Sequence, residues 1–128
     1  MNVRTVVLLG DDDIRSQVRA SLKSERNVDI VAEFCALQPR HLGSIDEMNP
    51  DLVILDCSSR RINPLLAMSD LAKTASRPQV VAVLAEGGIV DFKAIARLNP
   101  ASFVNSPAGL RRAVLAAPLP APVHGVAA

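Results

Sequence analysis

Aromatic residues are nearly absent from this chain of 128 residues: Phe34, Phe92 and Phe103 are the whole set, and there is no Trp or Tyr. This shortage disfavours sites where aromatic rings stack on nucleotide bases, and it disfavours most aromatic-lined ligand pockets. Hydrophobic residues still make up 49% of the sequence. We therefore expect one domain of ordinary size with a core of aliphatic side chains.

An excess of charge of one sign is also missing. Lys and Arg number 14 and Asp and Glu number 13, which gives a formal net charge of +1. Binding to nucleic acid or to anionic lipid relies on a strongly basic surface. We therefore expect this domain to contact neither nucleic acid directly nor a membrane.

Long apolar runs and cysteine motifs are lacking as well. The N-terminal apolar run covers only residues 6–9 before the acids Asp11–Asp13, which is too short for a signal peptide or a membrane span. The two cysteines, Cys35 and Cys57, have no metal-ligand spacing and are too few for a disulfide scaffold. We interpret both as small buried or half-buried thiols rather than redox sensors, and we expect a cytoplasmic protein.

Short continuous runs of aliphatic residues recur along the chain. Such runs are typical of strands that are covered on both faces, as in a parallel sheet. The predicted strands, the last of them the weakest, cover residues 6–9, 28–32, 52–55, 80–84 and 102–104.

Segments with helical spacing separate these runs, and the clearest places Ile14, Val18 and Leu22 on one face. Regular alternation of strand and helix predicts a doubly wound α/β domain with one five-stranded parallel sheet. We expect this domain over residues 1–116, followed by a Pro- and Ala-rich tail or linker over 117–128. The predicted helices cover residues 13–24, 38–48, 64–75, 90–98 and 107–117.

Acidic residues follow two of the predicted strands. Asp11, Asp12 and Asp13 come after the first strand, and Asp56 ends the third. Sites in such folds gather at the carboxyl ends of the strands, and carboxylates are the oxygen ligands that hold Mg²⁺. Asp11, Asp12 and Asp56 are therefore candidate metal ligands. The alternative is that the acids before Ile14 only cap the following helix.

Three segments, VVLLGDDDIRSQVRASL, NPDLVILD and FVNSP, resemble the receiver domain of two-component response regulators, over about residues 3–116. VDIVAEF is similar to the second strand of the class linked to a C-terminal helix-turn-helix DNA-binding domain. The resemblance implies a (βα)5, flavodoxin/CheY-like sheet in the order 2-1-3-4-5, with Asp56 as the counterpart of the phospho-acceptor. It also implies a sensor kinase or an output domain as partner, a homodimer, and no enzymatic activity of its own.

The sequence departs from the family pattern at the positions that would serve the phosphoryl group. The register of the first helix places the family's acid pair on Leu9 and Gly10. The hydroxyl residue of the fourth strand falls on Ala85, and the family's Lys falls on Ser106, before Pro107. Losing the Lys removes a charge-assisted contact worth about 1.5–3 kcal/mol.

Two features of the family's switch have counterparts in this chain. Phe103 falls at the family's switch aromatic, and Arg60 and Arg61 offer a partial replacement for the missing cation. The leading hypothesis is a receiver-like signalling domain with impaired phospho-switching, which regulates an output such as transcription through protein contacts. One alternative is a working Mg²⁺-dependent phospho-receiver with Asp56 as acceptor. The other is a small α/β enzyme or ligand-binding domain.

Overall fold

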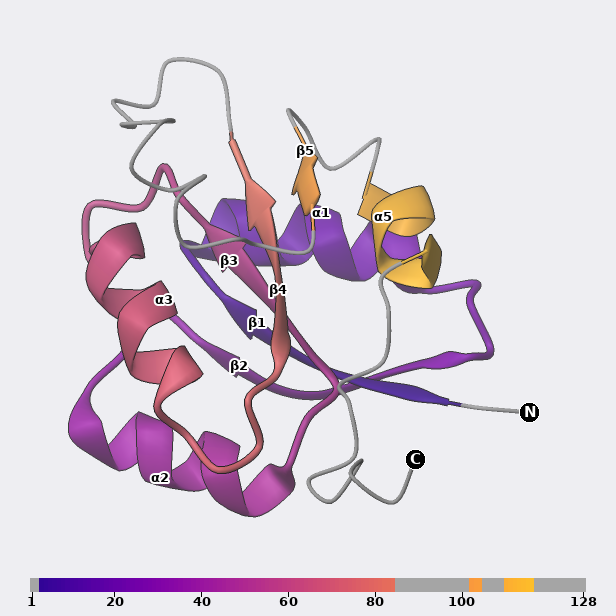
Figure 1. The fold of residues 1–128 in the computed structure, drawn as a ribbon. Helices are drawn as coiled ribbons and strands as arrows, with labels where there is room; N and C mark the ends of the chain where they lie inside the picture. Colours follow the sequence, from indigo (N-terminus) through magenta and orange to yellow (C-terminus); the bar gives the residue numbers. More distant parts are fainter. Residues whose placement is uncertain (1–2, 85–101, 105–109, 117–128) are drawn as a thin grey trace, which may run out of the picture.

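The computed structural model describes residues 3–84, 102–104 and 110–116. Its strands form one parallel sheet in the order β2-β1-β3-β4-β5 (Figure 1). The predicted parallel α/β arrangement is confirmed. The strands are Arg4–Leu9 (β1), Val28–Phe34 (β2), Leu52–Asp56 (β3), Gln79–Val83 (β4) and Ser102–Val104 (β5).

Helices cover both faces of the sheet. In Figure 1, α1 and α5 lie on one face, and α2 and α3 lie on the other. The helix expected over residues 90–98 and the tail over 117–128 lie outside the described residues. None of the helices described here is long and apolar enough to cross a membrane. The helices are Asp12–Leu22 (α1), Pro39–Met48 (α2), Pro64–Ala72 (α3) and Leu110–Ala116 (α5).

Neighbouring residues of each central strand point to opposite faces of the sheet. Val6 and Leu8 of β1 pack into the core beneath α1 and α5, whereas Val7 and Leu9 pack into the core beneath α2 and α3. β3 is buried along its whole length. Both faces need aliphatic side chains, which explains why these strands read as continuous apolar runs.

The edge strand β2 contains a bulge at Val31. Val6 pairs with Ile30 and Val7 pairs with Ala32, so Val31 has no partner in β1. One extra residue reverses the alternation of the strand. Ile30 accordingly packs toward α1 and α5, whereas Ala32 packs toward α2 and α3.

Glu33 follows the bulge and connects β2 to α1. Its carboxylate accepts hydrogen bonds from Arg19 Nε at 2.8 Å and from Arg15 Nη1 at 3.3 Å. Arg15 Nε also donates to the carbonyl oxygen of Gly10 at 3.0 Å. Through Arg15, Glu33 therefore helps to fix the loop between β1 and α1. This loop forms part of the candidate site.

Candidate functional site at the carboxyl ends of the strands

Asp56 is the last residue of β3 and is buried, with 1% of its surface exposed. Its Oδ1 accepts hydrogen bonds from the backbone N–H of Ser58 at 2.9 Å and from the Ser58 hydroxyl at 2.5 Å. Its Oδ2 accepts one from the backbone N–H of Asp11 at 3.2 Å. The protein's own donors therefore engage both carboxylate oxygens, as burial of a charged group requires.

Gly10 packs directly against Asp56. A Cβ atom on Gly10 would overlap the Cβ of Asp56 and lie 3.0 Å from its Oδ2. The Gly10 backbone is also fixed, because its N–H donates to the carbonyl of Phe34 at 3.0 Å and its own carbonyl accepts from Arg15. This position has no room for a carboxylate, and the preceding Leu9 is buried in the core beneath α2 and α3.

Asp11 occupies the N-cap position of α1, but its side chain makes no capping hydrogen bond. Asp11 Oδ1 instead accepts a hydrogen bond from the Ser59 hydroxyl at 2.8 Å. The prediction that acids before Ile14 cap the helix is therefore wrong for the Asp11 side chain, which Ser59 engages from the neighbouring loop. Asp12 and Asp13 lie in the first turn of α1, where negative charge is favourable.

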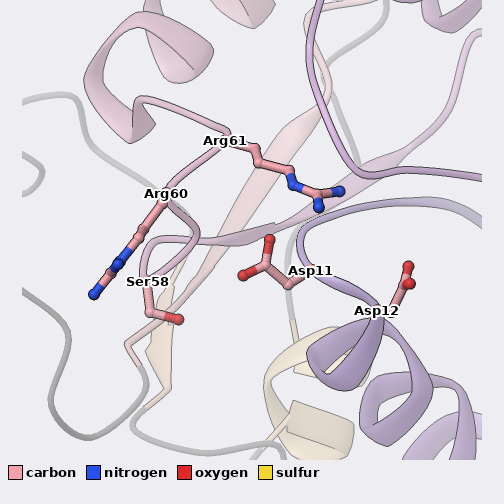
Figure 2. Close-up of a pocket in the computed structure, with 5 residues that line it drawn as sticks. All are labelled: Asp11, Asp12, Ser58, Arg60 and Arg61. Atoms are coloured by element: carbon pink, nitrogen blue, oxygen red, sulfur yellow. The ribbon is translucent and has the colours of Figure 1, made fainter.

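Asp12 lies apart from the pair formed by Asp11 and Asp56. Its side chain is 85% exposed and forms an ion pair with Arg15, and Figure 2 shows its carboxylate over the start of α1, away from Asp11. Among the described residues, which include all three predicted ligands, no group of three or more His, Cys, Asp and Glu side chains is placed to hold a metal ion. Because Mg²⁺ needs several oxygen ligands in near-octahedral geometry, this arrangement does not fit the predicted three-carboxylate site.

A pocket of about 310 Å³ opens at this corner, and its lining includes Asp11, Asp12, Ser58, Arg60 and Arg61 (Figure 2). The Arg61 side chain extends toward Asp11, whereas Arg60 points away from it. Both arginines are exposed, and neither forms an ion pair within the described part of the chain. Arg60 and Arg61, the two cations noted in the sequence, therefore line the same pocket as Asp11.

Sequence reasoning missed the contacts of Ser58, Ser59 and Gly10. A Ser two residues after an Asp is typical of a local turn that the Asp side chain closes, so the spacing of Asp56 and Ser58 is a signal that could have been read. The contact of Ser59 with Asp11 joins residues 48 positions apart. Nothing in the sequence pattern indicates that contact, or the close approach of Gly10 to Asp56.

Cys57 lies beside Asp56 and is buried. Burial, and to a lesser extent the charge of Asp56, raises the pKa of the Cys57 thiol to about 12. The thiol is therefore protonated and unreactive near neutral pH. The interpretation of Cys57 as a small buried residue is confirmed, and Cys35 is half-buried, within what was predicted for it.

Most of the predicted switch positions fall in parts of the chain that the structure does not describe. Ala85, Ser106 and Pro107 are among these positions. Phe103 lies in β5, where its backbone pairs with Ala82 of β4. The roles assigned to all four positions stay predictions.

No family model and no curated protein matches this sequence, but many solved structures match the fold. The REC domain of RcsB from Salmonella enterica serovar Typhimurium, solved in the presence of the phosphomimetic BeF3⁻, has a TM-score of 0.75 at 16% identity, over 90% of this chain and 88% of that chain. The receiver domain of the putative response regulator NarL from Mycobacterium tuberculosis has a TM-score of 0.73 at 18% identity, over 90% and 95%. The response regulator ChrA of a heme-sensing two-component system has a TM-score of 0.72 at 20% identity, over 91% and 57%.

The chain therefore has the CheY-like α/β fold of response-regulator receiver domains. The likeness covers about nine-tenths of the chain in each of these comparisons. The resemblance drawn from the sequence motifs is confirmed at the level of the fold.

Proposed function

We propose that this chain is a receiver-type signalling domain that acts through protein contacts, without a phosphorylation switch at Asp56, and that it is not an enzyme. The observation that carries the proposal is that the Asp56 carboxylate is buried and hydrogen-bonded within the protein. It is 1% exposed, and it accepts hydrogen bonds from Ser58 and from the backbone of Asp11. In this role Asp56 stabilises the loops around it instead of receiving a phosphoryl group.

The chemistry of phosphoryl transfer supports this reading. An incoming phosphoryl group carries negative charge, so its transfer to a carboxylate needs a cation that neutralises both groups. Position 10 has no room for an acid, and Asp12 is engaged by Arg15. Arg61 brings positive charge to the pocket, but a guanidinium donates hydrogen bonds and does not coordinate oxygens as a metal ion does.

The partners and the output are proposed from the fold. RcsB, NarL and ChrA are response regulators, and the match to ChrA covers only 57% of the ChrA chain. We therefore propose a protein partner, either a sensor kinase or an output domain that acts in transcription, and a cytoplasmic location with homodimers. In this proposal residues 1–116 form the signalling domain and residues 117–128 form a tail or linker.

A second candidate is a Mg²⁺-dependent phospho-receiver in which Asp56 is the acceptor. One observation favours it: the backbone N–H of Asp11 donates to Asp56 Oδ2 at 3.2 Å. The backbone of a second acidic residue therefore lies next to the acceptor. In that case Asp11 and Asp56 together would hold the metal ion.

An NMR titration separates the two candidates. MgCl2 with BeF3⁻ is added to the ¹⁵N-labelled chain, and the amide shifts of residues 10–13 and 56–61 are followed, with the Asp56→Asn chain as the matched control. The proposal predicts no saturable shift in these segments. Saturable shifts that disappear in Asp56→Asn would overturn it in favour of the phospho-receiver.

A further inference from the structure

We propose that the β3–α3 surface, which we define as Ser58, Arg60, Arg61, Leu65 and Leu66, is a docking site for an acidic protein segment that carries an apolar side chain. These residues come from the loop after β3 and from the first turn of α3. The inference deepens the proposed function and rests on it, because it names the surface through which the domain would contact its partner.

The charge of this surface comes from two arginines. Arg60 and Arg61 are exposed and form no ion pair with the residues that the structure describes. Of the two acids at this pocket, Asp11 accepts a hydrogen bond from Ser59 and Asp12 pairs with Arg15, and neither forms an ion pair with Arg60 or Arg61. The two guanidinium groups are therefore available to carboxylates of a partner, which they bind in paired hydrogen bonds.

The apolar part of this surface begins four residues after Arg61, in the first turn of α3. Leu66 is 61% exposed, more than any other exposed large hydrophobic residue in the described part of the chain, and Leu65 is 36% exposed. The core-facing side of α3 consists of other residues, Ala67, Met68 and Leu71. A single exposed Leu is ordinary, but here two exposed leucines follow a pair of exposed arginines within seven residues of the chain, across one loop and one helical turn.

Buried side chains and hydrogen bonds fix the loop that presents these residues. Ser59 and Ile62 are buried on either side of Arg60 and Arg61, and the Ser59 hydroxyl accepts a hydrogen bond from the backbone N–H of Arg61 at 3.1 Å. The Asn63 side chain caps α3 by accepting from the N–H groups of Leu65 and Leu66. A surface that is already ordered loses little conformational entropy when a partner binds.

An acidic protein segment fits this surface better than a nucleic acid does. Carboxylates on the partner complement Arg60 and Arg61, and an apolar side chain of the same segment covers Leu66. Asp11 and Asp12 line the same pocket as Arg60 and Arg61, so the continuous negative charge of a phosphate backbone would also face these acids, whereas a peptide can place its carboxylates at the arginines alone. A phosphate backbone would also leave Leu66 exposed to water.

A peptide selection tests the chemistry of the partner. A random library of short peptides displayed on phage is sorted on the full chain. The affinity of the enriched peptides for the parent chain and for three variants is then measured by fluorescence anisotropy.

The variants separate charge from apolar contact. The double variant Arg60→Glu/Arg61→Glu reverses the charge of the surface, and Leu66→Ser removes its most exposed apolar side chain. Arg26→Glu/Arg40→Glu is the matched control, because both of these arginines are exposed elsewhere on the molecule. Circular dichroism verifies that every variant is folded.

We expect the enriched peptides to combine Asp or Glu with an apolar residue. Their affinity should fall about tenfold or more in Arg60→Glu/Arg61→Glu and should weaken in Leu66→Ser, but stay within about twofold in the control. The inference is overturned if no peptide is enriched, if the enriched peptides carry no acidic excess, or if both double variants lose affinity equally. Failure here leaves the Mg²⁺ and BeF3⁻ titration unchanged, so it is distinguishable from failure of the proposed function.

Discussion

Gly10 and Asp56 lie so close together that no side chain fits between them. A Cβ atom on Gly10 would overlap the Cβ of Asp56 and come within 3.0 Å of its Oδ2. The resemblance to the receiver family predicts one acid of the family's pair at this position. The departure is therefore more than the loss of a carboxylate, because this position has no room for any side chain unless its backbone or Asp56 shifts.

The first prediction concerns this close approach. Gly10→Ala should lower the free energy of unfolding by about 1–3 kcal/mol, because the added methyl group overpacks a fixed contact. Gly43→Ala is the control, since nothing lies within 4 Å of a Cβ at Gly43 in the exposed part of α2. That change should raise stability by about 0.5–1 kcal/mol. Urea unfolding of both variants is the measurement, and equal effects of the two substitutions would count against the packing described here.

A second prediction follows from the three hydrogen bonds of Asp56. Asp56→Ala leaves the part-buried donors of Ser58 and of the Asp11 backbone without their acceptor. We expect a loss of about 1–3 kcal/mol in the free energy of unfolding. Asp29→Ala, at an exposed site on β2, should change stability by less than about 0.5 kcal/mol. A variant Asp56→Ala as stable as the parent chain would contradict the structural role of this carboxylate.

The contact between β2 and α1 gives a third prediction. Glu33→Gln keeps the size of the side chain but removes the charge that binds Arg15 and Arg19. Because these groups are partly exposed, we expect a loss of only about 1 kcal/mol, which shrinks as salt screens the pairs. Glu47→Gln, on the exposed side of α2, is the control. Thermal unfolding at low and high salt checks this, and a loss that does not depend on salt would argue against an ionic contact.

The buried thiol of Cys57 predicts a dependence of stability on alkaline pH. Burial raises its pKa from the ordinary value of 9.0 to about 12. Above about pH 9 the unfolded chain therefore releases a proton that the folded chain keeps, so the free energy of unfolding falls as the pH rises. Cys57→Ala should show a smaller fall between about pH 8 and about pH 10 than the parent chain. Urea unfolding across this range is the measurement, and identical pH profiles for the parent chain and Cys57→Ala would refute it.

Periodicity predicted most of the fold because buried parallel strands and amphipathic helices leave local patterns in the sequence. The run from Val6 to Leu9 is continuous because both faces of β1 are covered. The bulge at Val31 was not predicted, since VDIVAEF reads as one regular strand until its pairing with β1 is known.

The candidate site was predicted less completely than the fold. Asp56 could be placed at the end of a strand from its motif alone. The engagement of Asp11 by Ser59 depends on two loops far apart in the sequence. No local pattern encodes that contact, so sequence reasoning expected capping of α1 or a metal site there instead.

The most direct test of the central claim is whether Asp56 accepts a phosphoryl group. The chain is incubated with phosphoramidate and MgCl2 and its intact mass is recorded, beside Asp56→Asn and a receiver domain of known phosphorylation. Because the carboxylate of Asp56 is buried and held by Ser58 and Asp11, we predict that the mass of the chain does not change while the reference domain is modified. Stoichiometric addition of one phosphoryl group, labile to hydroxylamine and absent in Asp56→Asn, would contradict the account.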